Sequence, residues 1–293
     1  MHIPSRIIVF VSLFVAFCVL AAPVAANAQN AERTVTNTVP MDSDGTVTVE
    51  NHDGEINITT WNRSEVQVEA RIVHEDEDTV RDTRIRTESS DSEVEIESDF
   101  DDVEKSGFWG ARSVPDVFYT LRVPAGASLE IDDHGSAINV DGLQGQVDVD
   151  SHDGGIQLSR IGGPVRIDTH DGAIDLRDIT GAVEIDSHDG DVTASGLRGP
   201  LTVDTHDGRV NAAFSSLDGP VEIDSHDARV RLTLPTGAAF TLQTDMGDDG
   251  NVEVEPEMSL TSMDEGDIEA TVNGGGPEIY VSAHDGSLQI ETQ

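Results

Sequence analysis

Residues 165–182 read VRIDTHDGAIDLRDITGA, and residues 183–200 read VEIDSHDGDVTASGLRGP. The second segment follows the first directly and repeats its pattern position by position. In both, apolar and polar residues alternate on each side of a central His-Asp-Gly. Alternation with a period of two residues is typical of β-strands that bury one face. Each segment therefore predicts two short strands joined at a His-Asp-Gly corner.

The same unit recurs through the middle of the chain. Further copies begin at Leu129, Val147, Leu201 and Val221, and the copy from Leu201 carries two extra residues. A unit this short cannot bury its own apolar face, so neighbouring units must stack, each strand pairing with its equivalent in the next coil. We therefore predict an all-β fold: a right-handed parallel β-solenoid of 18-residue coils with β-rich N- and C-terminal caps.

Stacking would place equivalent residues in rows at intervals of about 4.8 Å. The expected interior rows contain only aliphatic residues. One of them consists of Ile131, Val149, Ile167, Ile185, Val203 and Ile223. Burial of one such side chain contributes roughly 1.5–3 kcal/mol, so a few per coil can hold a narrow core together.

The first residues of the chain predict a secretory signal peptide over 1–28. Arg6 precedes an apolar run from Ile7 to Ala22, and Ala26-Asn27-Ala28 offers a cleavage site. The run is shorter than the roughly 20 residues that a membrane-spanning helix needs. The single cysteine, Cys18, lies inside it. A chain cleaved after Ala28 would have no cysteine, which excludes disulfides and cysteine-ligated zinc.

The rest of the chain divides into three expected regions. Residues 29–128 are an N-terminal β-rich cap, 129–236 are the regular repeats, and 237–293 are C-terminal solenoid coils and a cap. Degenerate copies of the repeat, VTVENHDGEINI from Val47 and IYVSAHDGSLQI from Ile279, predict coils of the same kind at both ends. Terminal caps of this sort protect the open edges of a stacked sheet.

Two segments of the N-terminal region break the strand pattern. The charge run from Glu75 to Asp82 predicts either a short helix or a solvated loop. Residues 100–117 predict a long irregular loop, and the segment Phe118–Val123 that follows predicts a strand leading into the first regular repeat.

The chain is strongly acidic, with 57 Asp and Glu against 17 Lys and Arg and a net charge of −40. Removal of residues 1–28 would leave 16 basic and 57 acidic residues, a net charge of −41. This charge argues against binding to nucleic acid or to anionic lipid. The chain contains one lysine, Lys105. An acid-rich, lysine-poor surface suits concentrated salt, so a halophilic source is a hypothesis.

The sequence resembles the bacterial putative-adhesin domain family, a domain of unknown function with a β-solenoid-like fold. The resemblance rests on VTVENHDGEINITTWNRSEVQVEA from Val47, YTLRVPAGASLEI from Tyr119, the repeated units, and NGGGPEIYVSAHDGSLQIE from Asn273. It implies the fold over nearly the whole mature chain. It implies no catalytic residues, and a fold does not decide a function.

The repeated corner carries the candidate site. In the units that begin at Val147, Val165, Val183, Leu201 and Val221, each histidine is preceded by one aspartate two positions earlier and followed directly by another. The candidate metal ligands are His152, His170, His188 and His206 together with Asp150, Asp168, Asp186 and Asp204. Stacked coils would make these rows of cation sites, with Ca²⁺ preferring carboxylates and Zn²⁺ preferring imidazole. Alternatively, the Asp and Ser/Thr side chains satisfy backbone N–H groups of the corner, the histidines stack, and no cofactor is bound. The calcium β-roll motif G-G-x-G-x-D is absent.

The same residues do not predict an enzyme. Ser, His and Asp occupy equivalent places in every unit, whereas a catalytic triad needs one unique arrangement with an oxyanion hole. We expect a non-enzymatic extracytoplasmic protein, periplasmic or secreted to the cell surface, that acts in adhesion, scaffolding or protein–protein contact. Its expected partner is a protein or a cell-surface glycan, without nucleic acid and without membrane insertion after signal removal. The alternatives are a divalent-cation-binding module and, more distantly, a carbohydrate-active enzyme.

Overall fold

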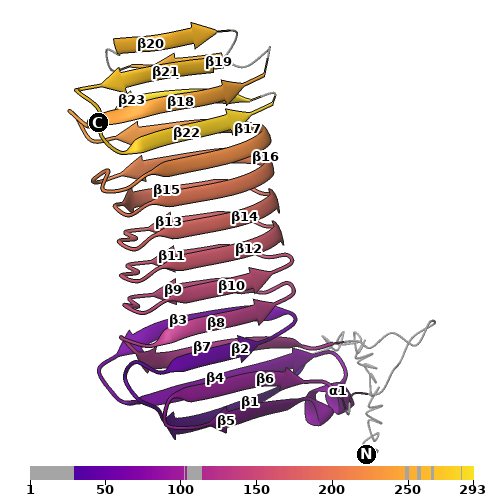
Figure 1. The fold of residues 1–293 in the computed structure, drawn as a ribbon. Helices are drawn as coiled ribbons and strands as arrows, with labels where there is room; N and C mark the ends of the chain where they lie inside the picture. The colour runs from indigo at the N-terminus through magenta and orange to yellow at the C-terminus, as the bar shows by residue number, and fades with distance from the viewer. Residues whose placement is uncertain are drawn as a thin grey trace, which may run out of the picture.

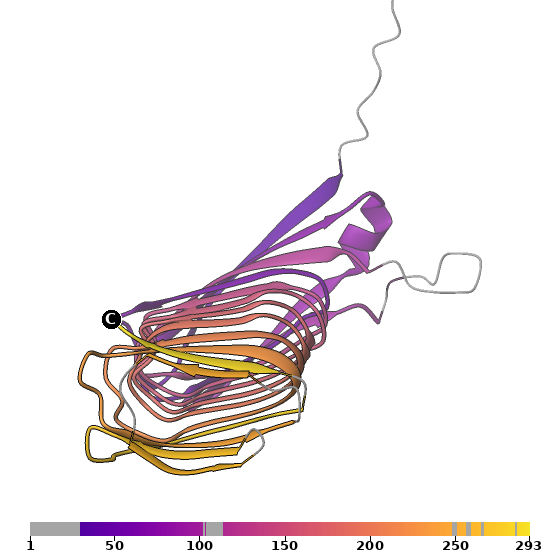
Figure 2. The same cartoon turned by 90° about the horizontal axis from the view of Figure 1, so that it is seen from above.

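The structure is a computed structural model, and it describes residues 30–101, 103, 114–247, 251–255, 259–264, 267–284 and 286–293, with only the backbone over 259–264. Over these residues the chain forms 23 strands of one sheet and a single short helix. Figure 1 shows the strands stacked as a tall column, and Figure 2 shows the coils nested along its axis. The chain is therefore all-β and solenoid-like, as the repeat predicts. The proposed signal peptide lies outside the described residues.

The regular repeats form a parallel array. Their first strands are β8 (Ser128–Asp133), β10 (Val147–Ser151), β12 (Val165–Asp171), β14 (Val183–Asp189), β16 (Leu201–Phe214) and β17 (Val221–Leu234). Their second strands are β9 (Ala137–Asp141), β11 (Ile156–Ser159), β13 (Ile174–Arg177) and β15 (Val192–Leu197), continued by the second halves of β16 and β17. Val147 pairs with both Leu129 and Val165. Equivalent residues of successive repeats therefore lie opposite each other.

The two degenerate repeats extend this array at both ends. The first is formed by β2 (Thr46–Glu50) and β3 (Gly54–Trp61), which pair in parallel with β8 and β9. The second is formed by β22 (Glu278–Ala283) and β23 (Ser287–Thr292), which pair in parallel with β17. The last repeat thus stacks directly on residues 221–234, although residues 235–277 lie between them in the chain.

The N-terminal end of the column contains the remaining early elements. They are β1 (Ala31–Pro40), β4 (Glu65–His74), α1 (Glu77–Asp82), β5 (Arg84–Ser89), β6 (Glu93–Asp99) and β7 (Asp116–Pro124). Here β4 pairs antiparallel with β1 and β7, and β5 pairs antiparallel with β6. The charge run forms the helix α1, whose N-cap Asp76 accepts a hydrogen bond from the Thr79 N–H. The strand predicted from Phe118 begins two residues earlier, at Asp116.

The C-terminal end has a mixed arrangement. It is formed by β18 (Phe240–Met246), β19 (Asn251–Val254), β20 (Ser259–Asp264) and β21 (Asp267–Val272). Of these, β18 pairs in parallel with β22 and antiparallel with β21, and β20 also pairs antiparallel with β21. The strands β18, β20 and β21 therefore lie farther along the column than the last repeat, so order along the chain and order along the column differ.

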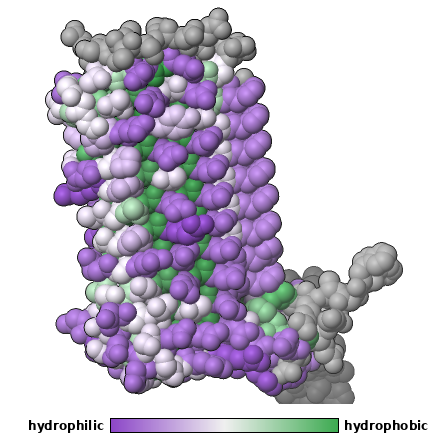
Figure 3. Space-filling view, viewed as in Figure 1, coloured by the Kyte–Doolittle hydropathy of each residue, from purple (hydrophilic) through white to green (hydrophobic). Residues whose placement is uncertain are grey.

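The core is the narrow aliphatic interior that the repeat predicts. Ile131, Val149, Ile167, Ile185, Val203 and Ile223 are all buried, with 0–3% of their surface exposed. Larger buried side chains occur where the regular pattern changes, such as Tyr119 in β7 and Phe240 in β18. Figure 3 shows hydrophilic side chains repeated along the outside of the column, with narrow hydrophobic strips between them.

Glycine occupies the close approach of one corner to the next at Gly172, whereas Ala228 holds the equivalent position in the repeat from Val221. Gly172 has a φ of +145°, and a Cβ atom at this position would lie 2.0 Å from the carbonyl oxygen of Gly154. Residues with a Cβ atom avoid this backbone conformation, and no side chain fits into this space. The His-Asp-Gly sequence therefore lets successive coils pack at strand spacing through the corner.

Candidate functional site: the histidine and aspartate rows of the corner

The corner sends alternate side chains inward and outward. In the sequence Asp-Ser/Thr-His-Asp, the hydroxyl residue is buried, whereas the aspartates and the histidine are exposed. The hydroxyls of Ser151 and Thr205 each donate a hydrogen bond of 3.1 Å to the backbone carbonyl two residues ahead, at Asp153 and Asp207. These hydroxyls thus satisfy backbone carbonyls, not the N–H groups that the sequence suggested. At these two levels the bond holds the corner, and the alternation of side chains along the strand places the histidine on the outer face.

The histidines form one continuous row on the column. This histidine row consists of His52, His134, His152, His170, His188, His206, His226 and His284. Neighbouring ring centroids are 4.7–5.2 Å apart throughout. From His152 to His284 the neighbouring planes deviate from parallel by at most 6°. The stacking of the histidines is confirmed, and the row is longer than the regular repeats.

The aspartate after each histidine from His152 to His226 faces that histidine. These following aspartates are Asp153, Asp171, Asp189, Asp207 and Asp227, and their carboxylates lie 3.1–3.5 Å from the adjacent histidine Nδ1. In the strand register, Asp189 lies opposite Asp171 on one neighbouring strand and opposite Asp207 on the other. From His152 to His226 the corner therefore presents an imidazole nitrogen and a carboxylate at each level.

The acidic residues two positions before the histidines, together with Glu97, form a separate carboxylate row. Its members pair in register on neighbouring strands: Glu97, Glu50, Asp132, Asp150, Asp168, Asp186, Asp204 and Asp224. Burial, and then repulsion from neighbouring carboxylates, raises the pKa of Glu50, Asp150 and Asp204. A groove lined by these aspartates, the hydroxyl residues and the histidines follows the corner from Asp168 to His284.

All eight predicted ligands lie on this exposed corner. The structure brings His152, His170, His188 and His206 together with the following aspartates, whereas the predicted Asp150, Asp168, Asp186 and Asp204 lie in the carboxylate row. The prediction did not include His52, His134 and His284. Their signal was present, because His134 belongs to the first regular repeat and His52 and His284 belong to the degenerate copies.

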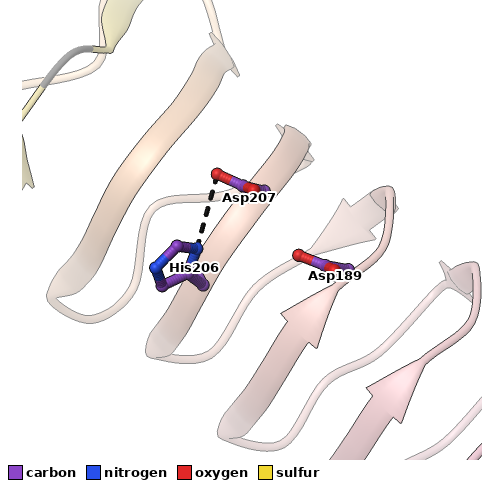
Figure 4. Close-up of side chains that lie close together, drawn as sticks. All are labelled: Asp189, His206 and Asp207. Atoms are coloured by element: carbon purple, nitrogen blue, oxygen red, sulfur yellow. Dashed lines mark ion pairs between the residues drawn. The ribbon is translucent and has the colours of Figure 1, made fainter.

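One group of side chains has donor atoms close enough to share a metal ion. Among the described residues, Asp189, His206 and Asp207 each offer a ligand atom, and these atoms all lie within 4.8 Å of one another. Figure 4 shows the two carboxylates on neighbouring coils, with His206 paired to Asp207. All three residues are exposed. The group can therefore exchange ligands with solvent.

At one level of the corner an acid replaces the hydroxyl residue. Asp133 pairs in register with Ser151 and is 4% exposed. Its carboxylate accepts hydrogen bonds from the Ser136 N–H and hydroxyl. Burial raises the pKa of Asp133, against the effect of the Ser136 hydrogen bonds. This buried acid marks the junction between the N-terminal coil and the regular repeats.

The fold and its repeated corner define a stacked-coil, all-β domain. The Toastrack DUF4097 family matches residues 11–291, and the chain belongs to this family. No curated protein matches the chain. Within the described residues, no helix has the length and apolar character required to cross a membrane.

Solved structures resemble the chain in fold at low sequence identity. A putative adhesin from Bacteroides fragilis is 10% identical with a TM-score of 0.53, over 89% of this chain and 97% of that one. Two proteins from Parabacteroides distasonis score lower. A putative adhesin is 11% identical (TM-score 0.31, 88% and 97% covered), and a putative lipid binding protein is 12% identical (TM-score 0.27, 88% and 96% covered). The Bacteroides structure supports the fold alone.

Proposed function

We propose that this protein is an exported, non-enzymatic surface or envelope module that acts in adhesion, scaffolding or protein–protein contact. The observation that carries the proposal is the repetition of the same exposed side chains at successive levels of the regular repeats. We take the coils as right-handed, each one formed by a single 18-residue repeat, with the insertion in the repeat from Leu201. Such a surface offers a partner many equivalent contacts instead of one reaction centre.

Repetition makes weak contacts additive. A partner with a regular spacing of its own can bind several levels at once, and each further contact is then intramolecular. The net charge of −40 favours partners with cationic groups and disfavours nucleic acid. A cationic protein segment or a cell-surface glycan that carries amino groups therefore fits this surface best.

Two features support an extracytoplasmic location. Residues 1–28 have the pattern of a signal peptide, and the one cysteine, Cys18, lies within them. The Bacteroides fragilis structure of the same fold is described as a putative adhesin. We propose display in the periplasm or at the cell surface, without insertion of the mature chain into the membrane.

Fractionation and binding together test this proposal. Epitope-tagged protein should be recovered, shortened at its N-terminus, from the periplasm, the envelope or the medium. The purified protein should bind source cells or an envelope extract, and binding should weaken in high salt. Recovery of the uncleaved chain in the cytoplasm, or catalytic turnover in a glycan-degradation screen, would overturn the proposal.

The second candidate function is binding of divalent cations. The specific observation in its favour is the row of eight in-register carboxylates from Glu97 to Asp224, beside the histidine row. Adjacent charges about 4.8 Å apart repel by roughly 3 kcal/mol at an effective dielectric constant near 20, and bound cations would relieve this. A calcium or zinc titration at fixed ionic strength should raise the melting temperature. An unchanged melting temperature with both ions removes this candidate.

A further inference from the structure

We propose that Asp189, His206 and Asp207 form a binding site for a transition-metal ion of the Zn²⁺ class, with ligands from two successive coils. The inference rests on the second candidate function and assigns it a metal class and a ligand set. Under this assignment the carboxylate row before the histidines is not the zinc site. The site belongs instead to the aspartates that follow them.

The donor atoms are already near the separation that zinc requires. In a tetrahedral site with metal–ligand distances of about 2.0–2.1 Å, neighbouring ligand atoms lie about 3.3 Å apart. His206 Nδ1 and the Asp207 carboxylate are 3.5 Å apart, and the three ligand atoms lie within 4.8 Å of one another. Side-chain rotation of the exposed Asp189 can close the remaining gap, and water can complete the coordination.

The backbone holds the two carboxylates together. Asp189 in β14 and Asp207 in β16 are direct partners in the parallel register. His206 stacks between His188 and His226 with planes 2–3° from parallel, and this stacking fixes the direction of its ring. The site is therefore pre-organised by the strands and the histidine row, not by a mobile loop.

The charge at this level favours a cation. The nearby Arg209 donates to Asp191, so its charge is engaged on another side chain. Among the described residues, the ion pairs of Asp189 and Asp207 are with His188 and His206, and imidazole carries a charge only when protonated. At neutral pH a divalent ion between the two carboxylates would cancel their charge and replace repulsion with two bonds.

The ligand types select zinc over calcium. Calcium prefers six to eight oxygen ligands, whereas one imidazole with two carboxylates suits Zn²⁺ and its neighbours in the transition series. The same residue types recur one level away, because Asp171 pairs with Asp189 and Asp227 pairs with Asp207. Each aspartate would serve two adjacent levels, so we expect filling at alternate levels, where every ion meets two carboxylates.

The experiment is a Zn²⁺ titration of the chelator-treated, purified protein by isothermal calorimetry, with Ca²⁺ as a parallel arm. Three variants remove proposed ligands: Asp189→Asn, His206→Gln and Asp207→Asn. The matched control is Asp186→Asn, which removes the same charge from the same strand in the carboxylate row. We expect each ligand variant to weaken the tightest Zn²⁺ binding at least tenfold or to lower the number of bound ions, and Asp186→Asn to change the affinity less than twofold.

Circular dichroism without metal shows that each variant is folded, and histidine ¹⁵N spectra provide the direct readout. Zn²⁺ should shift the Nδ1 resonance that His206→Gln removes. Equal loss of affinity in Asp186→Asn and Asp189→Asn, or no shift of that resonance, overturns the inference. If the protein binds calcium and only Asp186→Asn weakens that binding, the zinc-site inference is overturned, but the second candidate function stands. Absence of binding by both ions overturns both, while the surface function is tested separately by cell binding.

Discussion

The imidazoles of His206 and His226 stack with centroids 4.9 Å apart and planes 2° from parallel, although the repeat that begins at Leu201 is longer than its neighbours. The pairing explains how the insertion is absorbed. Register is kept from Leu201 paired with Val221 to Ala213 paired with Thr233. The extra residues therefore fall in the connection after Phe214, on the other side of the coil from the histidines.

The first prediction concerns the effect of electrostatic repulsion within the carboxylate row on stability. Burial, followed by the charges of Asp186 and Asp224, raises the pKa of Asp204. A carboxyl group with a raised pKa favours the fold most when it is protonated, and this contribution is lost as the pH rises through its folded-state pKa. We expect Asp204→Asn to raise the melting temperature at neutral pH and low salt. The gain should shrink near 1 M salt, where the Debye length is about 3 Å; a salt-independent loss of stability would contradict this.

Asp133 gives a prediction with a defined pH dependence. Burial raises its pKa above the ordinary 3.8, so the unfolded chain releases this proton at a lower pH than the folded chain. Asp133 therefore costs stability as the pH rises through and above this range. We expect the melting temperature of Asp133→Thr to increase relative to that of the unmodified protein as the pH rises from about 4 to about 7. A relative gain that grows toward acid pH would refute this account of Asp133.

The corner glycines give a steric prediction. Gly172→Ala places a Cβ 2.0 Å from the Gly154 carbonyl oxygen in a backbone with φ +145°. We expect a loss of about 3 kcal/mol or more in the free energy of unfolding. The control Gly237→Ala has a φ of +81° but no atom within 4 Å, so it should lose only about 1–2 kcal/mol. Urea denaturation measures both, and equal losses would show that coil contact at Gly172 is unimportant.

The interior rows predict how much one coil contributes to stability. Ile185 is 1% exposed, so Ile185→Ala should cost about 2–5 kcal/mol. Its neighbour Glu184 is exposed and forms a surface ion pair with Arg166, so Glu184→Ala should cost less than about 1 kcal/mol. Similar losses for the two variants in chemical denaturation would contradict the assigned inward and outward faces.

The sequence predicts the all-β fold and the interior rows well, because each repeat carries its own period-two pattern. The six aliphatic residues of the row that starts at Ile131 and ends at Ile223 are buried as predicted. The register is fixed because a shift of one residue would turn every one of these side chains outward. The corner glycines were predictable for a similar reason, since only glycine tolerates the contact at Gly172.

The order of the outer strands was not predictable in this way. The repeat from Ile279 stacks on the repeat from Val221, and strands β18 and β21 lie beyond it. Any coil with this pattern can stack on any other, so the pattern alone does not select a neighbour. At the site, the motif places an aspartate on both sides of His206, but which carboxylate faces its Nδ1 depends on side-chain torsions. The sequence therefore locates the candidate corner without selecting its ligands.

The central claim is that equivalent residues of successive repeats stack in register along one axis. Spin-label distance measurements test it in a Cys18→Ser background, since Cys18 is the only cysteine. Asp148 and Glu222 are four pairings apart, through Arg166, Glu184 and Thr202, and Glu130 pairs with Asp148 one level farther on. Labels at Asp148→Cys and Glu222→Cys should be about 19 Å apart, and labels at Glu130→Cys and Glu222→Cys about 24 Å. If the distance between labels at 130 and 222 does not exceed the distance between labels at 148 and 222 by about one strand spacing, the stacked coil is contradicted.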